Sequence, residues 1–254
     1  MTDHELSDPS ADPAARAHSV PLRGMRKRIA RNVFESLQTT AQVTSFYDID
    51  ASGLVALRAR VRVAHNHAPA IGYNALLVAA VAAALRAEPT VNARIEGNNI
   101  VTPSQVDVGF AVALDEAFAF GGGLIVPVVC DADTKSLAEI EAELGDKVDR
   151  ARSKALLPEE VTGGTFTISN LGSLPGASHW RGATPIATVG QSAILAVGRL
   201  RDAIVVGDDR TPTVGSVLPL SLTHDHRLID GSVAGAFIDA MVRAFTTLGR
   251  STYG

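Results

Sequence analysis

The sequence predicts an α+β fold, a two-layer sandwich in which helices cover a mixed β-sheet. Three observations lead to this prediction. Amphipathic helical patterns and β-rich runs both occur along the chain, and they mix without a regular βαβ repeat. Hydrophobic residues make up 46% of the 254 positions, which is enough for one substantial core. No internal repeat is apparent, so we expect one folded unit.

Composition excludes several classes of partner and compartment. The formal charge is -4, and Lys and Arg are scattered, so we expect no nucleic-acid partner. Cys130 is the one cysteine and cannot form an intrachain disulfide. Neither a signal peptide nor an apolar run as long as a membrane span is present. These features predict a cytoplasmic protein that does not bind membranes.

The first half of the chain is predicted to be mainly helical. Residues 1–20 are polar and rich in Pro, Ala and Asp, which predicts a disordered tail or linker before a domain over 21–254. Met25, Ile29, Val33 and Leu37 recur at helical spacing within "GMRKRIARNVFESLQ". In order, we then expect a strand in "QVTSFYDIDAS", helices in "GLVALRARVRVAHNH" and "NALLVAAVAAALRAEP", and a hairpin in "ARIEGNNIVT".

The second half is predicted to contain most of the sheet. We expect β-rich runs in "SQVDVGFAVALD" and "GGLIVPVVCD", then a helix in "SLAEIEAELGDKVDRARSKAL". Three further strands are predicted in "GGTFTISNLGS", "SAILAVGRLRDAIVV" and "GSVLPLSLTHDHR", and a closing helix in "GSVAGAFIDAMVRAFTTL". Gly121 to Gly123 match no phosphate-binding loop, so a turn before a strand is the better interpretation.

The stretch "SLTHDHRLIDGS" is the strongest candidate for a functional site. His226, Asp230 and Gly231 follow the pattern H-x-x-x-D-G where a buried strand gives way to a loop and a helix. Imidazole, with a pKa of about 6.5, can take a proton from a thiol of pKa about 8.5 and return it later. That chemistry suits acyl transfer between thiols. On composition alone, a polar turn stabilised by Asp and Arg explains the stretch equally well.

Two other groups of polar residues need weighing. Thr167 and Ser169 share one face of a predicted strand and could offer a hydroxyl to an oxyanion, although strand hydroxyls are usually only satisfied polar groups. No G-x-S-x-G surrounds Ser169, which argues against a serine nucleophile. The pairs His65/His67 and His224/His226 lack a second cluster at zinc-like spacing, so we expect no metal site.

Eight stretches, in order, resemble the catalytic domain of the 2-oxo acid dehydrogenase E2 components, the dihydrolipoamide acyltransferases. They are "RGMRKRIARNVFESLQ", "VTSFYDID", "AVAAALRAEPTVNA", "VDVGFAVAL", "GLIVPVV", "GGTFTISNLGS", "TPIATVGQSAILAVGR" and "SLTHDHRLIDG". They span about residues 21 to 250. The resemblance implies a chloramphenicol acetyltransferase-like fold and the movement of an acyl group between dihydrolipoamide and coenzyme A.

The same resemblance implies roles for particular residues. His226 would be the general base that deprotonates the attacking thiol, and Ser169 would hydrogen-bond the oxyanion. Asp230 would be a structural carboxylate paired with Arg26, with Gly231 supporting the same loop. In the family, the histidine and the serine of one site come from different chains of a trimer, and trimers can assemble into a 24-mer or 60-mer. The resemblance assigns no coenzyme A-binding residue and leaves the role of His224 open.

The chain also departs from full-length members of that family. It shows no lipoyl domain and no peripheral subunit-binding domain, and its Asp146-Lys147 pair lies in a predicted helix rather than at a hairpin tip. We therefore expect the lipoyl group on another domain or chain, with E1 and E3 components as further partners. Two alternatives stay open: a catalytically weak architectural core that recruits partner subunits, and a stand-alone acyltransferase with a different acceptor.

Overall fold

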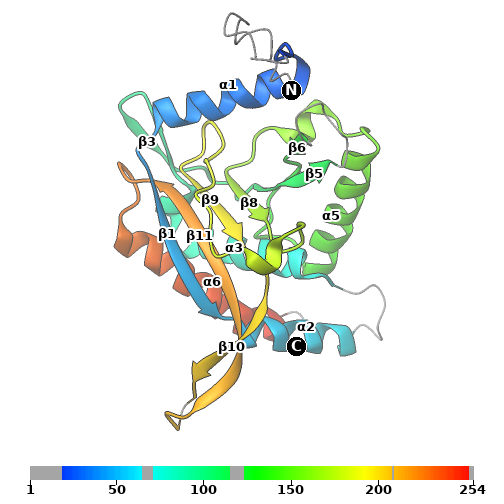
Figure 1. Ribbon diagram of the computed structural model, residues 1–254, viewed down its shortest axis with the longest axis vertical. Coiled ribbons are helices and arrows are strands. Elements are labelled where there is room, and N and C mark those ends of the chain that lie inside the picture. Colours follow the sequence, from blue (N-terminus) through cyan, green and yellow to red (C-terminus); the bar gives the residue numbers. More distant parts are fainter. Residues whose placement is uncertain (1–18, 65–70, 115–122, 208, 252–254) are drawn as a thin grey trace, which may run out of the picture.

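A computed structural model describes residues 19–64, 71–114, 123–207 and 209–251. Figure 1 shows a mixed sheet with helices behind it, which confirms the predicted α+β sandwich. Part of the predicted tail, His65, His67, Gly121 and Gly122 lie outside the described residues.

Six helices and eleven strands make up the described fold, with two short 3-10 turns, η2 (Pro158–Val161) and η3 (Ala177–His179). The helices are α1 (Gly24–Thr39), α2 (Ser52–Ala64), α3 (Tyr73–Ala87), α4 (Pro89–Asn92), α5 (Leu137–Arg152) and α6 (Gly231–Ser251). The strands are β1 (Gln42–Asp50), β2 (Arg94–Glu96), β3 (Asn99–Val101), β4 (Val108–Phe110), β5 (Val112–Leu114), β6 (Gly123–Ile125), β7 (Val128–Val129), β8 (Phe166–Asn170), β9 (Ala193–Val197), β10 (Arg201–Val206) and β11 (Pro212–Asp225).

The main sheet has the strand order β1-β11-β9-β8-β4-β7, and β10 also pairs with β11. Strand β8 runs parallel to both β4 and β9, whereas the other pairs are antiparallel. The sheet is therefore mixed, as predicted. The long strand β11 connects the parts of this sheet, because it pairs with β1 on one edge and with β9 and β10 on the other.

The run predicted as one strand in "SAILAVGRLRDAIVV" is divided into β9 and β10. Val197 pairs with Leu220 and Arg201 pairs with Val217, so four steps on this side match three steps on β11. One extra residue is the mark of a β-bulge, which increases the local twist. Beyond the bulge, β10 and the start of β11 project from the body as a two-stranded ribbon, residues 201–207 and 209–217 (Figure 1).

The two β-rich runs before α5 are also divided. Strands β4 and β7 pair within the main sheet, while β5 and β6 form a separate two-stranded ladder. Pro127 separates β6 from β7, and its carbonyl accepts from Phe110. Because proline has no N–H to give to a ladder, the interruption at this position is expected.

The hydrophobic core lies between the sheet and the helices α2, α3, α5 and α6. Alternate residues of β11, Leu218, Leu220 and Leu222, belong to this core. Helix α3 is buried along most of its length, as its Ala-rich and Leu-rich sequence predicts. The opposite face of β11 carries the buried polar residues Ser221 and Thr223. Ser221 accepts a hydrogen bond from the backbone of Ala183, so the segment before β9 covers this face.

Helix α1 lies on the surface, and Ser36 is its one buried residue. Its hydrophobic side chains Val33, Phe34 and Leu37 are 37%, 66% and 47% exposed. The helix is attached at its end, where Ser36 donates to the carbonyl of Ala187 at 2.6 Å. The amphipathic pattern therefore predicted the helix correctly, but a single chain leaves much of its apolar side uncovered.

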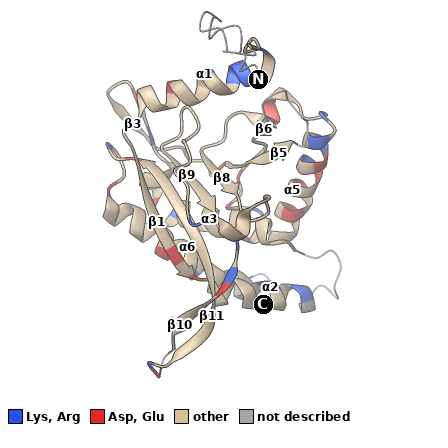
Figure 2. Ribbon diagram, viewed as in Figure 1, with Lys and Arg blue, Asp and Glu red and all other residues tan. Residues whose placement is uncertain are grey.

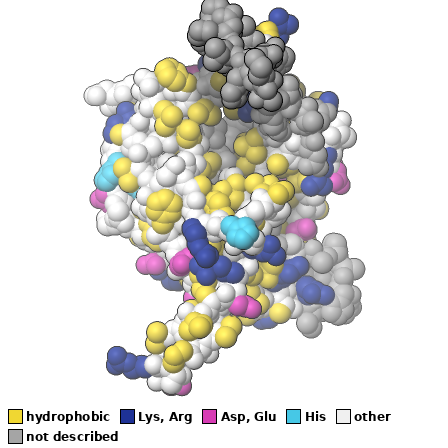
Figure 3. Space-filling view, in the orientation of Figure 1, with side chains coloured by type: hydrophobic (Ala, Val, Ile, Leu, Met, Phe, Trp, Pro, Cys, Tyr) yellow, Lys and Arg dark blue, Asp and Glu magenta, His cyan; other side chains and the backbone are white. Residues whose placement is uncertain are grey.

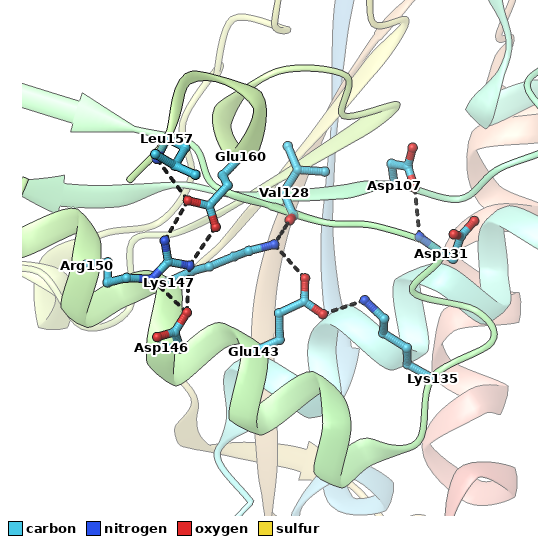
Figure 4. Close-up of polar contacts among 10 residues, drawn as sticks. All are labelled: Asp107, Val128, Asp131, Lys135, Glu143, Asp146, Lys147, Arg150, Leu157 and Glu160. Atoms are coloured by element: carbon cyan, nitrogen blue, oxygen red, sulfur yellow. Dashed lines mark hydrogen bonds and ion pairs between the residues drawn. The ribbon is translucent and has the colours of Figure 1, made fainter. Parts of the chain in front are cut away.

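Helix α5 contains Asp146 and Lys147, which confirms that this pair is helical. Figure 4 shows Lys147 extending to the carbonyl of Val128 and to Glu143, which also binds Lys135 at 2.5 Å. The Lys147 side chain is 10% exposed. A lysine in these contacts is part of the structure of the domain and is not presented for modification.

In the view of Figure 2, acidic and basic residues are interspersed and form no continuous basic face. None of the described helices is both long and apolar enough to cross a bilayer.

Candidate active site

The loop after β11 is held by a buried carboxylate. Asp225, the last residue of β11, is 2% exposed and accepts hydrogen bonds from Arg227 Nε at 2.9 Å and Nη2 at 2.5 Å. Burial raises the pKa of Asp225, but the bonds from Arg227 outweigh it and lower the pKa overall. Arg227 also donates to the carbonyl of Thr39, at the end of α1, at 2.7 Å. This pair thus ties the loop to the α1–β1 connection.

His226 lies between these two residues. Its backbone N–H donates to the carbonyl of Ala41 at 2.9 Å, so its main chain is fixed, while its side chain is exposed. A group with a rigid backbone and an accessible imidazole meets the geometric requirement for a general base. The structure therefore places the predicted base where a substrate can reach it.

Asp230 caps the closing helix. Its Oδ1 accepts from the backbone of Ser232 and of Val233, both at 2.9 Å, which is N-cap geometry for a helix beginning at Gly231. These bonds, the one from Val233 first, lower the pKa of Asp230. An added Cβ at Gly231 would meet nothing within 4 Å, so close packing in one chain does not require this glycine.

Asp230 and its predicted partner Arg26 lie at the starts of two different helices, α6 and α1. Arg26 belongs to the first turn of α1. Figure 1 shows the start of α1 and the start of α6 on opposite sides of the molecule. The contacts described for Asp230 are with its own helix. The pairing stays a prediction, which would need a neighbouring chain.

Ser169 lies near the end of β8 with a partly exposed side chain, and among the described residues its hydroxyl takes no hydrogen bond. Thr167, on the same face of the strand, is 1% exposed and donates to Gln191 at 2.7 Å. Its hydroxyl is therefore already used within the chain. Ser169 is the hydroxyl that remains available to a substrate.

Ser169 and His226 lie far apart within one chain. Ser169 pairs with Ala196 of β9, whereas His224 pairs with Ala193, and His226 is two residues further on. Five residues correspond to about 16 Å along the strands, and two strand spacings to about 10 Å across them. The separation is thus about 19 Å. The two side chains of one chain cannot act on the same carbonyl group.

A cavity of about 510 Å³ opens beside the end of β8. Asn170 and Ser173 line it on the strand side, and Tyr73, Asn74 and Val148 line it on the helix side. Arg199, in the bulge between β9 and β10, contributes a positive charge to its wall. The strand ends meet closely here, because a Cβ on Gly172 would lie 2.4 Å from the carbonyl oxygen of Gly198.

Sequence reasoning left Asp225 and Arg227 without a role, although they hold the loop. The alternation D-H-R was the available signal, since residues two apart at a strand end point to the same side. Within the described ranges, no group of three or more His, Cys, Asp or Glu side chains is arranged as a metal site.

Comparison with known proteins gives one consistent result. Residues 14–249 match the family model of the 2-oxoacid dehydrogenases acyltransferase (catalytic domain). The chain is 36% identical, over 225 residues, to the dihydrolipoyllysine-residue succinyltransferase component of the 2-oxoglutarate dehydrogenase complex of Bartonella vinsonii subsp. berkhoffii. The alignment covers 88% of this chain and 52% of that protein. The chain thus spans about half the length of the curated relatives it matches.

Solved structures of similar proteins point to the same family. The dihydrolipoamide acetyltransferase of Azotobacter vinelandii, studied for the role of a serine, a histidine and an asparagine in its catalytic mechanism, superposes with a TM-score of 0.79 at 31% identity, over 97% of this chain and 98% of that one. The cubic core of a pyruvate dehydrogenase multienzyme complex gives a TM-score of 0.80 at 31% identity, over 95% and 97%. Chloramphenicol acetyltransferase, at 15% identity and a TM-score of 0.52, shares the fold. This chain belongs to the 2-oxoacid dehydrogenase acyltransferase family, of which it matches the catalytic domain.

Proposed function

We propose that this protein transfers an acyl group between the thiol of a dihydrolipoyl group and the thiol of coenzyme A, as the core of a 2-oxo acid dehydrogenase complex. The observation that carries the proposal is the fixed, solvent-facing imidazole of His226 on the loop anchored by Asp225. The availability of the Ser169 hydroxyl supports it. Like His226 and Asp230 here, the histidine and the asparagine studied in the Azotobacter protein are four residues apart.

The proposed reaction needs no covalent acyl-enzyme. His226 takes the proton from the attacking thiol, and the thiolate attacks the thioester carbonyl carbon. Ser169 donates a hydrogen bond to the oxyanion that forms. When the tetrahedral intermediate collapses, the carbon–sulfur bond to the other thiol breaks, and the departing thiolate takes the proton back from His226. The acyl group has then moved, and His226 is neutral again.

Two chains must contribute to each such site. Because about 19 Å separates Ser169 from His226 in one chain, we assign the serine of one chain to the histidine of its neighbour. Exposed apolar side chains support assembly: Ile204, Val206 and Val214 on the ribbon are 80%, 77% and 73% exposed. Figure 3 shows hydrophobic side chains gathered along this ribbon. A homotrimer, built up into a 24-mer or 60-mer, is the proposed assembly.

Coenzyme A is proposed as a substrate that enters through the 510 Å³ cavity beside β8. Its apolar walls suit a pantetheine chain, and Arg199 at the wall suits a phosphate. The lipoyl group would come from another domain or chain, with E1 and E3 components as further partners. A cytoplasmic location and the absence of a metal complete the proposal.

A panel of acyl donors tests the function. Acetyl-CoA, branched acyl-CoAs and succinyl-CoA are each assayed with dihydrolipoamide, for wild type and for His226→Ala. We expect turnover with one class of donor and a loss of two or more orders of magnitude in the variant. The exposed His179, changed to Ala, serves as the matched control and should keep full turnover. No transfer with any donor would contradict the function and favour a scaffold.

A further inference from the structure

His224 is a buried histidine directly behind the proposed base. It lies in β11 between Val43 of β1 and Ala193 of β9, and it is 1% exposed. Its Nε2 lies 3.5 Å from Ser45 Oγ, the outer limit of a hydrogen bond. Its Nδ1 is buried and has no hydrogen-bond partner within the described part of the chain. A buried polar atom without a partner is unfavourable, so its retention calls for an explanation.

The His224 ring contacts the ring of His226. The two ring centroids are 5.9 Å apart, and the ring planes meet at 69°. Burial, and next the neighbouring His226, lower the pKa of His224, with Asp225 opposing. The burial of His224 between β1 and β9 therefore favours its neutral form. A neutral imidazole has one N–H donor and one acceptor nitrogen, and in the tautomer whose Nε2–H donates to Ser45 Oγ the acceptor is Nδ1.

Two carboxylates near His226 are hydrogen-bonded to other groups. The carboxylate of Asp225 binds Arg227 and the backbone of Ala41. Oδ1 of Asp230 caps α6, and the charge of Asp230 also interacts with His226. The partners of His224 on β1 and β9, Val43, Ser45 and Ala193, carry no charge. In the described part of the chain, no side chain is hydrogen-bonded to the His226 ring, and the neighbouring ring of His224 has an Nδ1 without a hydrogen-bond partner.

We propose that His224 is the positioning residue of His226, a neutral imidazole whose Nδ1 accepts a hydrogen bond from His226 once His226 carries the proton of the thiol. This inference rests on the proposed function, because it concerns the same base. The exposed His226 ring reaches Nδ1 by rotating about its side-chain bonds, as catalytic hydrogen bonds tighten when substrate is bound. His224 thereby does what a carboxylate does for the histidine of a triad, with no added charge.

The proposal predicts the direction of a pH shift. An acceptor for the second N–H of the imidazolium stabilises the protonated form of His226 and raises its pKa. Removing that acceptor lowers the pKa of His226, so the acid limb of the kcat/KM profile moves to lower pH. The base also becomes weaker and less well oriented, so kcat falls by about tenfold while KM is unchanged. A residue that only fills space would not move the limb.

Two substitutions of nearly equal size separate these roles. His224→Asn retains an acceptor close to the position of Nδ1, whereas His224→Leu removes it. We expect kcat of His224→Leu to be about tenfold below wild type and the acid limb of its kcat/KM profile to lie at lower pH. For His224→Asn, both kcat and the position of the acid limb should be close to wild type. Native mass by light scattering and the melting temperature show whether each variant folds and assembles. Equal profiles for folded His224→Leu and wild type would overturn the proposal, as would a shift to higher pH.

A second measurement does not depend on turnover. The rate at which diethyl pyrocarbonate modifies His226, followed by peptide mass spectrometry against pH, reports the pKa of that imidazole. The pKa obtained in this way should be lower in His224→Leu than in wild type and close to wild type in His224→Asn. If the wild type transfers no acyl group while this shift is found, the proposed function fails and the positioning role stands. If transfer occurs and the modification profiles coincide, the positioning role fails alone.

Discussion

Asp225 and Arg227, two residues apart, form a bidentate ion pair on either side of the proposed base. The carboxylate is 2% exposed, whereas the guanidinium side chain is 45% exposed and reaches the carbonyl of Thr39. The pair joins the end of β11 to the end of α1, and His226 is carried on the short segment between them. The position of the base thus depends on a contact between segments far apart in the sequence.

Replacing Asp225 by Asn should therefore weaken both stability and catalysis. Hydrogen bonds to charged groups contribute about 1.5–3 kcal/mol, and the exposure of Arg227 favours the lower end of this range. We expect urea unfolding at fixed protein concentration to show a loss of about 2 kcal/mol. Turnover should fall by more than tenfold, because His226 is no longer held in place.

The matched control is Asp239→Asn, at an exposed position of α6. It should leave both stability and turnover near wild type, since exposed substitutions usually change stability by less than about 0.5 kcal/mol. Equal effects of the two substitutions would show that the Asp225 pair has no special role in holding the loop.

Mixing two inactive variants tests whether two chains share a site. Ser169→Ala chains retain His226, and His226→Ala chains retain Ser169. In randomly mixed trimers made by co-expression, about a quarter of the sites would combine the intact serine of one chain with the intact histidine of the next. We expect about that fraction of wild-type turnover to return. Each variant expressed alone supplies the baseline, and turnover at that baseline in the mixture would place both groups in one chain.

The sequence predicted most helices and strands, but it did not predict how far apart residues lie in the fold. The helical spacing of apolar residues in "GMRKRIARNVFESLQ" made α1 predictable, although one chain leaves its apolar side uncovered, and the apolar run "GSVLPLSL" made the largely buried strand β11 predictable. The division between β9 and β10 was not, because a one-residue bulge depends on register against Leu220 and Val217 and leaves no local signal.

The same limit applies to the site. His226 could be identified as a candidate because its motif is local. Ser169 could be identified because the stretch around it resembles the acyltransferase family. Their separation of about 19 Å follows from pairing across three strands, which no local pattern encodes. The role of Asp230, by contrast, depends on residues next to it in the sequence. Its position before Gly231 is a local N-cap signal, and the structure finds it in that role.

Charging the ribbon should reduce assembly without unfolding the chain. Ile204 and Val214 pair across β10 and β11, and both are at least 73% exposed in a single chain. An Ile204→Asp substitution therefore costs a lone chain little, but it would place a charge in a contact between chains. We expect light scattering to show a smaller particle with an unchanged circular dichroism spectrum. Thr213→Asp, next to Val214 and also exposed, is the control and should keep the wild-type mass. A wild-type mass for Ile204→Asp would exclude the ribbon from the interface.

The Glu143 network of α5 should make the domain less stable in acid. Burial raises the pKa of Glu143, but hydrogen bonds from Lys135 and Lys147 outweigh it, so the pKa lies below its ordinary 4.5. Because the folded state holds the proton less tightly than the unfolded state, the stabilisation is complete above about pH 4.5 and is lost as the pH falls toward the lowered pKa.

Urea unfolding at pH 7 and pH 4 measures this loss. Glu143→Gln should cost about 2 kcal/mol at pH 7, because it leaves the largely buried Lys147 without its carboxylate (Figure 4). The difference from wild type should narrow at pH 4, because Glu143 of the unfolded wild-type chain takes up a proton there more readily than the folded chain does. Adding Lys147→Met to Glu143→Gln should recover much of the cost, since an apolar side chain needs no partner at this position. The exposed Glu159, changed to Gln, should follow the wild-type profile. Parallel profiles for Glu143→Gln and wild type would mean that the network contributes no pH-dependent stability.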